Sequence, residues 1–404
     1  MRAPFATLLA TLAFAWVSPV QGGEPSLRHV RPDRASGGSA AVVVGEDAAL
    51  VHTTQIFPPQ VQDEPESEDR QIELVLNRLD VILSAAKSGM DRVVKLHVVV
   101  ERADLIPKIR EAFVKRIADH DGPAWTVVVG ELARPGAILA IDAVATTDAK
   151  PAPGRVEQLV VRALADQLPG ATFATISAGR RVFISGQAEP DADLAAATRK
   201  TLESLEESLK HLGMGKEHIA QLKAFYLPAD SAEIVWRETT QFFGEAVSPP
   251  LVLVEWKSSS SLPIEIELVA FAPDQAPEGA EAVEYLTPPG LTPSPVFSRI
   301  ARVNRGDLVF VSGLTGPEGA SGAEQVEAIF AELKAILDEA GSDFRHMAKA
   351  TYYVADNEAS VALNELRPNH YDPARPPAAS KAIVPGTGSP GRSVEVDMIA
   401  VGKP

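Results

Sequence analysis

The feature that most constrains the fold is a set of signals that recurs three times in the same order. In each unit an amphipathic stretch ending in glycine precedes a strand-like stretch, a second helix and two closing strands. An acidic residue in the last strand recurs about 125 and 130 residues apart, at Asp142, Glu267 and Asp397. Solenoid repeats are only about 20–50 residues long, so this period predicts repeated domains. We expect three tandem α+β domains (an α/β sandwich), each of order ββαβαββ.

The local signals are specific enough to give bounds. The first helix of each unit is predicted over residues 72–89, 197–213 and 324–341, with the glycine at each end as the C-terminal cap. A strand follows at residues 93–100, 219–227 and 347–354. The second helices open near Asp104, Asp230 and Asp356, and the last two aspartates are predicted N-caps. The strand before the first helix ends in a small polar step, at Thr53, Ser185 and Ser312.

Two linkers divide the chain. Residues 147–155 and 272–281 are rich in Pro, Ala and Gly and lack apolar periodicity. They predict domains over residues 28–147, 156–272 and 283–402, of which the first is the most diverged. A sheet with two helices covers only one of its faces. The other two copies on the same chain would cover the second face, which predicts an intramolecular pseudo-trimer and a monomeric protein.

The N-terminus has the parts of a secretory signal peptide. A short cationic start is followed by an apolar run of about 14 residues and then by small residues. The run is shorter than the roughly 20 residues of a transmembrane helix. We therefore predict a signal peptide over residues 1–22 and a periplasmic or secreted mature protein. The chain has no cysteine, which excludes disulfides and thiolate sites and suits an oxidising compartment.

Composition and charge exclude several function classes. The chain is 45% hydrophobic and 23% charged, which is typical of a globular protein and not of a disordered one. Its formal net charge of −16 argues against nucleic acid and anionic membrane surfaces as partners, because both need clustered Lys and Arg. Its eight histidines show no metal-binding spacing, and glycine-rich phosphate motifs are absent. We expect no metal, no cofactor and a small-molecule partner.

The ordered motifs resemble those of the Rid family, which contains imine and enamine deaminases that are also called L-PSP endoribonucleases. The third unit carries FVSGLTGP, EAIFAELKAILDEAG, the turn PAAS and the closing strand VEVDMIAV. The second carries FISGQ and PIEIELVAF. The resemblance implies chorismate-mutase-like domains around a barrel, with ligand clefts between them.

The resemblance also implies an arginine directly after the Pro-Ala turn, where its guanidinium would hold a substrate carboxylate bidentately. In this chain the position reads Trp125 in PAWT, Leu251 in PPLV and Ala379 in PAAS. Lys381 lies two residues after Ala379, and alternate strand residues share a face. Lys381 is therefore a candidate replacement cation, although a solvated lysine is the alternative. Trp125 would either stack on a flat ligand or plug the cleft.

Other candidate residues follow from the same pattern. Asp397 and Glu267 are candidate catalytic carboxylates, and Asp142 is a candidate ligand-binding one; each is otherwise a structural strand carboxylate. The steps Ser312-Gly313 and Ser185-Gly186-Gln187 could offer backbone N–H groups to an oxyanion, or be turns that need small residues. Asn364 matches a helix asparagine that the resemblance places near the cleft; the alternative is an exposed polar residue.

Three functions are compatible with these residues. The first is an exported protein that binds a small metabolite in inter-domain clefts without the deaminase arginine. The second is an imine or enamine deaminase that uses a closing-strand carboxylate together with Lys381. The third is a structural or interaction protein. The negative charge disfavours a nuclease.

Overall fold

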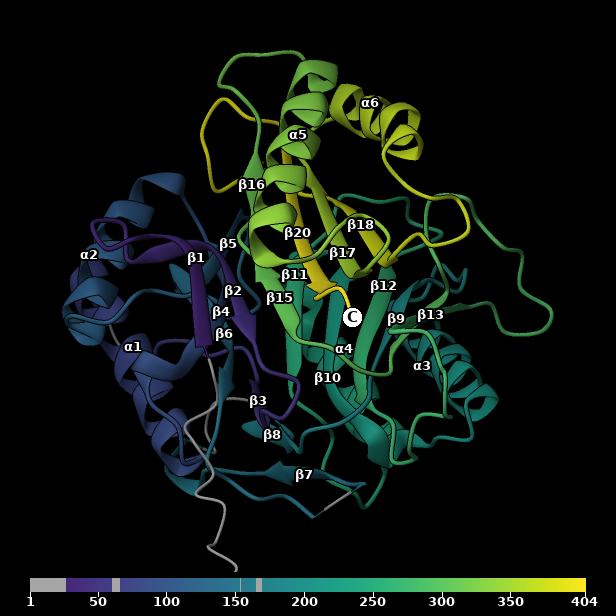
Figure 1. The fold of residues 1–404 in the computed structure, drawn as a ribbon. Coiled ribbons are helices and arrows are strands. Elements are labelled where there is room, and N and C mark those ends of the chain that lie inside the picture. Colours follow the sequence, from purple (N-terminus) through teal and green to yellow (C-terminus); the bar gives the residue numbers. More distant parts are fainter. Residues whose placement is uncertain (1–26, 60–65, 153, 165–168) are drawn as a thin grey trace, which may run out of the picture.

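The computed structural model describes residues 27–59, 66–152, 154–164 and 169–404. The predicted signal peptide, residues 1–22, lies outside these residues. In the part of the chain that is described, no helix is long and apolar enough to cross a membrane. The described residues form three mixed β-sheets with a pair of helices on the outer face of each (Figure 1).

Sheet I has the strand order β19-β5-β4-β6-β3-β8-β7. Its helices α1 and α2 pack on one face through a cluster of aliphatic and aromatic side chains. The elements are β3 (Leu50–Thr53), α1 (Glu68–Ala85), β4 (Val93–Val100), α2 (Ile106–Ile117), β5 (Ala124–Val129), β6 (Leu139–Thr146), β7 (Val156–Leu159), β8 (Phe173–Ile176) and β19 (Gly386–Thr387).

Sheet II has the order β11-β10-β12-β9-β14-β13 and carries α3 and α4. The elements are β9 (Arg181–Gln187), α3 (Leu194–His211), β10 (Ile219–Tyr226), α4 (Ala232–Phe243), β11 (Leu251–Glu255), β12 (Ile264–Phe271), β13 (Val283–Leu286) and β14 (Ile300–Val303). The predicted order of helix, strand, helix and two strands is therefore present here as well as in sheet I.

Sheet III has the order β1-β2-β15-β20-β17-β18, with β16 also paired to β20, and carries α5 and α6. The elements are β1 (Leu27–Asp33), β2 (Gly38–Val44), β15 (Leu308–Val311), β16 (Leu314–Thr315), α5 (Gly322–Ala340), β17 (Met347–Val354), α6 (Asn357–Leu366), β18 (Ala378–Ile383) and β20 (Val394–Val401). The expected α+β class with three tandem sheet-and-helix units is confirmed.

The sheets are assembled across the linkers. The hairpin β7–β8 follows the first linker but pairs with β3 of sheet I, and β13–β14 follows the second linker but pairs with β9 of sheet II. Sheet III is completed by the N-terminal hairpin β1–β2, which pairs with β15. In Figure 1 the purple β1 and β2 accordingly lie beside the green β15. The two ends of the described chain are thereby joined in one sheet.

The helix ends test the predicted caps. Gly341 is the C-cap of α5 and adopts the left-handed region at φ 79°. Gly213 directly follows the C-cap residue of α3, Leu212, and has φ 70°. The prediction is wrong at Gly89, which is extended, because Lys87 adopts the positive φ after α1. Asp356 caps α6 as predicted, with its carboxylate accepting from Ala359 N. Asp230 instead lies in a 3-10 turn, and Ser231 precedes α4.

Candidate functional site

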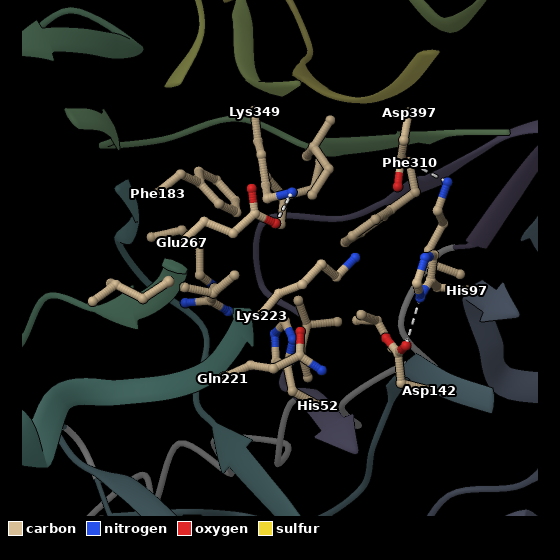
Figure 2. Close-up of a pocket in the computed structure, with 18 residues that line it drawn as sticks. His52, His97, Asp142, Phe183, Gln221, Lys223, Glu267, Phe310, Lys349 and Asp397 are labelled. Atoms are coloured by element: carbon tan, nitrogen blue, oxygen red, sulfur yellow. Dashed lines mark hydrogen bonds and ion pairs between the residues drawn. The ribbon is translucent and has the colours of Figure 1, made fainter. Parts of the chain in front are cut away.

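A cavity of about 50 Å³ lies where the inner faces of the three sheets meet. We call it the central chamber. Side chains from β3, β4, β6, β9, β10, β12, β15, β17 and β20 line it (Figure 2): Leu50, His52, Lys95, His97, Asp142, Val144, Arg181, Phe183, Gln221, Lys223, Glu267, Leu268, Val269, Leu308, Phe310, Lys349, Asp397 and Ile399. The outer faces of the same strands are apolar because they pack against the helices.

The strand registers relate the three sheets residue by residue. Asp142 is opposite His97, Glu267 is opposite Lys223, and Asp397 is opposite Thr351. Two residues earlier on the central strands, the equivalent positions hold Lys95, Gln221 and Lys349. The chamber therefore has a repeated layer of three carboxylates, two lysines and one glutamine.

Two of the carboxylates form ion pairs that cross between sheets. Lys95 Nζ of sheet I lies 2.8 Å from Asp397 Oδ1 of sheet III. Lys349 Nζ of sheet III lies 2.8 Å from Glu267 Oε1 of sheet II. Removing either partner would leave the other charge buried, so these pairs specify how the sheets meet.

The third equivalent pair is replaced. Gln221 stands where a lysine would face Asp142, and its amide donates to the carbonyl of Thr53 instead. Asp142 accepts from within its own sheet, with Oδ1 lying 2.8 Å from His97 Nδ1. The other ring nitrogen, Nε2, lies 3.1 Å from the hydroxyl of Tyr353 on sheet III. This buried Asp142–His97–Tyr353 chain joins sheets I and III.

Burial and neighbouring charge set the protonation of the chamber. Burial alone would raise the pKa of Asp397, but the ammonium groups of Lys95, Lys349 and Lys223 outweigh it and hold the pKa at about 2. Burial, together with the Arg181 charge, lowers the pKa of His52 to about 3. The pKa of His97 is lowered by burial and by Lys223 against the opposing effect of Asp142. Both imidazoles are therefore neutral near pH 7.

A second set of polar residues lies where the edge of one sheet meets the next. In each case a hydroxyl of the small polar step meets the backbone N–H of the residue after the Pro-containing turn. Ser312 Oγ accepts from Trp125 N at 2.9 Å, Ser185 Oγ from Ala379 N at 2.8 Å, and Thr54 Oγ1 from Leu251 N at 3.4 Å. Thr54 is therefore the equivalent residue in the first unit, and the predicted match to Thr53 is wrong by one position.

The glycines of the step approach a carboxylate. A Cβ on Gly186 would lie 2.0 Å from Glu265 Oε1, and one on Gly313 would lie 2.0 Å from Glu395 Oε1. A side chain at either glycine would therefore force the carboxylate to move. Glu265 and Glu395 precede Glu267 and Asp397 by two residues on the same strand faces, so they lie at the junctions while the latter two lie in the central chamber.

The three junctions differ in how they are filled. Between sheets III and I, Glu395 accepts from Val127 N and Gly388 N, and burial raises its pKa to about 7. Between sheets I and II, the position of these acids is Ala140, and Gln55 bonds both the N–H and the carbonyl of Leu253. Backbone groups of the neighbouring sheet thus occupy both junctions.

The junction between sheets II and III keeps two partly accessible ionisable groups. Burial and the nearby Glu267 raise the pKa of Glu265 to about 8, although Ser380 hydrogen-bonds it. Burial lowers the pKa of Lys381, which also feels the charge of Glu265. Lys381 Nζ lies 2.9 Å from Ser360 Oγ and 3.2 Å from Asn364 Oδ1 of α6. Glu265, Lys381 and these partners are called the II–III junction site.

The predicted site residues therefore fall into two groups. Asp397, Glu267 and Asp142 meet in the central chamber, whereas Ser312, Gly313, Ser185, Gly186, Lys381, Asn364 and Trp125 lie at or near the junctions. The step N–H groups already have acceptors: Gly313 N donates to Trp125 O and Gly186 N donates to Ser380 Oγ. Gln187 points away and donates to Ser208 on α3.

Trp125 is enclosed by helix α2 and the N-terminal hairpin. Its Nε1 donates to Gly37 O, Phe113 meets it edge-on at 5.1 Å, and the Arg110 guanidinium lies 4.7 Å over its ring. The indole thus fills the junction between sheets III and I and has no free face for a ligand.

Sequence reasoning missed Glu265, Glu395 and the chamber cations Lys95, Lys223, Lys349 and Arg181. A signal was present for all of them except Arg181. The closing strands read I-E-I-E and V-E-V-D, with two acids on one face, and a lysine in a continuous apolar strand is rarely buried without a partner. Among the described residues, no group of three or more His, Asp or Glu side chains is arranged to hold a metal ion.

Comparison with known proteins decides the family. The chain is 31% identical over 113 residues to Protein DfrA of Myxococcus xanthus, covering 84% of that protein and 26% of this chain. It is 30% identical over 129 residues to a RutC family protein of Aquifex aeolicus, covering 98% of that protein and 29% of this chain. A family model described as Endoribonuclease L-PSP matches residues 291–402. The chain belongs to the Rid family.

Solved structures of the Rid family match one unit at a time. A YjgF-family protein from Neisseria meningitidis is 25% identical, with a TM-score of 0.23, over 30% of this chain and 96% of its own. A Rid protein from Yersinia pestis is 22% identical, with a TM-score of 0.27, over 30% of this chain and 98% of its own.

Proposed function

We propose that this Rid-family chain binds a small anionic metabolite at the II–III junction site. The observation that carries the proposal is the contrast between the three junctions. Between sheets III and I, Glu395 accepts from two backbone N–H groups. Between sheets I and II, Gln55 fills the junction. Between sheets II and III, Glu265 and Lys381 stay partly accessible, and the charge of Glu265 affects the pKa of Lys381. Partly desolvated ionisable groups at a junction are what a polar ligand recognises.

The chemistry of the site favours a carboxylate-sized anion. The Lys381 ammonium is a donor with no competing carboxylate in direct contact among the described residues, since its hydrogen-bond partners there are the neutral Ser360 and Asn364. Because the pKa of Glu265 is raised to about 8, that carboxyl is mostly protonated at neutral pH and does not repel an anion. Both groups therefore suit a ligand with one negative charge.

The proposal includes loss of the standard deaminase anchor. The Rid resemblance places an arginine where this chain has Trp125, Leu251 and Ala379. A bidentate guanidinium orients a 2-imino acid more strictly than a single ammonium does. Binding without rapid turnover is the expected result of replacing it by Lys381.

One observation favours a second function, slow imine or enamine hydrolysis. A carboxyl with a pKa of about 8 can protonate the nitrogen that leaves as ammonia and, once ionised, can activate water. In that reaction water adds to the C=N carbon, the C–N bond breaks, and the products are a carbonyl compound and ammonia. Glu265 would take the role that was expected of Glu267 and Asp397.

We also propose that the chain acts as an exported monomer, in which three units replace the three subunits of a trimer. The inter-sheet ion pairs of the chamber support the proposal that the three units replace three subunits. Analytical ultracentrifugation of protein starting at residue 23 should show a compact monomer. Signal cleavage is tested by N-terminal sequencing of the exported protein.

The function is tested by calorimetric titration of pyruvate into the protein and into Lys381→Met, with the exposed Lys150→Met as the matched control. Lys381→Met should weaken binding at least tenfold and Lys150→Met should not change it.

The second function is tested by turnover. Ammonia release from iminopyruvate, generated in place by an amino-acid oxidase, is measured for the same proteins and for Glu265→Gln. Turnover that Glu265→Gln abolishes would establish the deaminase. No pyruvate binding and no turnover would overturn both functions.

A further inference from the structure

A wider space lies next to the central chamber. A second cavity of about 320 Å³ is formed by the loops that follow β2, β8 and β14. We call it the vestibule. Leu50, Arg181 and Leu308, which hold equivalent positions in the three sheets, line both the vestibule and the chamber. These three side chains separate the two cavities, and one of them, Arg181, is cationic.

The chamber contains cationic and polar groups that the protein itself does not match. Lys223 is 8% exposed, and no hydrogen bond or ion pair to its Nζ occurs among the described residues. Figure 2 shows its ammonium pointing into the space between Glu267, Phe310 and His97, with no dashed line to it. The Nε of Arg181 and both ring nitrogens of His52 are also buried without a hydrogen-bond partner.

The balance of charge is positive. The cationic side chains are Lys95, Lys223, Lys349 and Arg181, and the carboxylates are Asp142, Glu267 and Asp397. Lys95 and Lys349 are already paired with Asp397 and Glu267, and Asp142 is held by His97. The imidazoles are neutral at pH 7 because burial lowers the pKa of each. Lys223 and Arg181 therefore face the cavity without a carboxylate paired to either of them. The chamber as a whole has one more cationic side chain than it has carboxylates.

A buried charge that lacks a counter-charge is costly, and the walls around it give little solvation. Phe183, Phe310, Val144 and Val269 supply apolar surface on several sides of the chamber. The space is large enough for a few water molecules or one small ion, since one water needs roughly 10–15 Å³ of such volume. A metabolite of many atoms does not fit.

We propose that the central chamber binds one small monovalent anion of halide size, held by the Lys223 ammonium and admitted past Arg181 from the vestibule. The bound ion supplies the negative charge that Lys223 and Arg181 lack. This site is separate from the II–III junction site, and the proposal does not depend on the proposed function.

Bromide is the probe for this site. Crystals of the full mature chain grown with sodium bromide should show an anomalous peak in contact with Lys223 Nζ. Thermal unfolding is compared in sodium bromide and in sodium gluconate of equal ionic strength, because gluconate is too large for the chamber. Bromide should raise the unfolding temperature of the protein and of the exposed control Lys150→Met, and should have no such effect on Lys223→Met.

A second variant keeps the test open if Lys223→Met does not fold. Lys223→Thr copies the residue that sheet III has at the equivalent position, Thr351. It should fold and should weaken bromide binding at least tenfold in a calorimetric titration. The proposal is overturned if the chamber shows only water in the bromide crystals, or if bromide stabilises the wild-type protein and the Lys223 variants equally.

Discussion

Lys95 on β4 and Asp397 on β20 form a buried ion pair, 2.8 Å between Nζ and Oδ1, across the boundary between sheets I and III. Lys349 and Glu267 repeat it between sheets III and II. These pairs join segments about 80 to 300 residues apart, so they form only when the three sheets meet. We expect Lys95→Met to reduce the free energy of unfolding by about 3–5 kcal/mol, because it leaves the Asp397 carboxylate buried without its closest cation.

Urea denaturation measures that loss. The double variant Lys95→Met/Asp397→Leu is the informative control, since replacing both partners by apolar groups restores much of the stability of a buried pair. Equal stability of Lys95→Met and the wild-type protein would contradict the role given to this pair.

The chamber predicts a loss of stability in mild acid. His52 has a folded pKa of about 3, below its ordinary 6.5, so the unfolded chain takes up a proton that the folded chain refuses. The contribution of His52 to stability is therefore at its full value above pH 6.5 and is lost as the pH drops from 6.5 toward 3, whereas the raised pKa values of Glu265 and Glu395 at the junctions act in the opposite direction. Between pH 6.5 and 4.5 the loss from His52 amounts to about 2 kcal/mol.

His52→Phe tests this assignment. Phe183 and Phe310 occupy the equivalent positions of the other two sheets, so phenylalanine suits the site. Relative to the wild-type protein, the variant should lose less stability between pH 6.5 and 4.5, because the loss from His52 is gone while the contributions of His97, Glu265 and Glu395 remain. An unchanged slope would show that His52 is not the titrating group.

Gly186 and Glu265 should be energetically coupled. A Cβ at Gly186 would lie 2.0 Å from Glu265 Oε1, and Gly186 has no positive φ, so alanine is opposed by the carboxylate alone. We expect Gly186→Ala to cost about 1–3 kcal/mol through overpacking. The cost should largely disappear in the Glu265→Ala background. Chemical denaturation of the four proteins gives the coupling energy, and additive effects would refute the contact.

The N-terminal hairpin should be required to close sheet III. Without β1 and β2 the protein would lose the pairing of β15 with Ala41–Val44 and would expose a sheet edge. A chain that begins at residue 46 should therefore unfold at a temperature at least about 10 °C lower and should self-associate. Adding a peptide of residues 27–45 should reverse both effects, while a scrambled peptide should not. Calorimetry and light scattering provide the readouts.

Ala379→Arg restores the residue type that the Rid resemblance implies beside the II–III junction site. A guanidinium there can hold a carboxylate bidentately next to Lys381. We expect pyruvate binding to become about tenfold tighter, an effect of about 1.4 kcal/mol. Ala379→Met has similar length without charge and should give no gain. An equal response of both variants would place the ligand elsewhere.

Several elements could be predicted because they depend on neighbouring residues. The period of the apolar side chains located the six helices and the closing strands, and Asp356 and Gly341 were identified from short capping patterns. Cap prediction failed at Gly89 and Asp230, where the chain continues into 3-10 turns instead. Local patterns do not encode which sheet a hairpin joins, so the exchange of β7–β8 and β13–β14 was missed.

The sequence alone determined that three similar units follow one another, that each carries carboxylates on one face of its last strand, and that the three equivalent turn positions are Trp125, Leu251 and Ala379. Only the tertiary structure decided that Glu265 and Glu395 lie at the junctions while Glu267 and Asp397 lie in the central chamber. Alternation places both acids of a strand on the same face. What each acid meets on that face depends on how far the neighbouring sheet reaches, and that is a property of packing between distant segments.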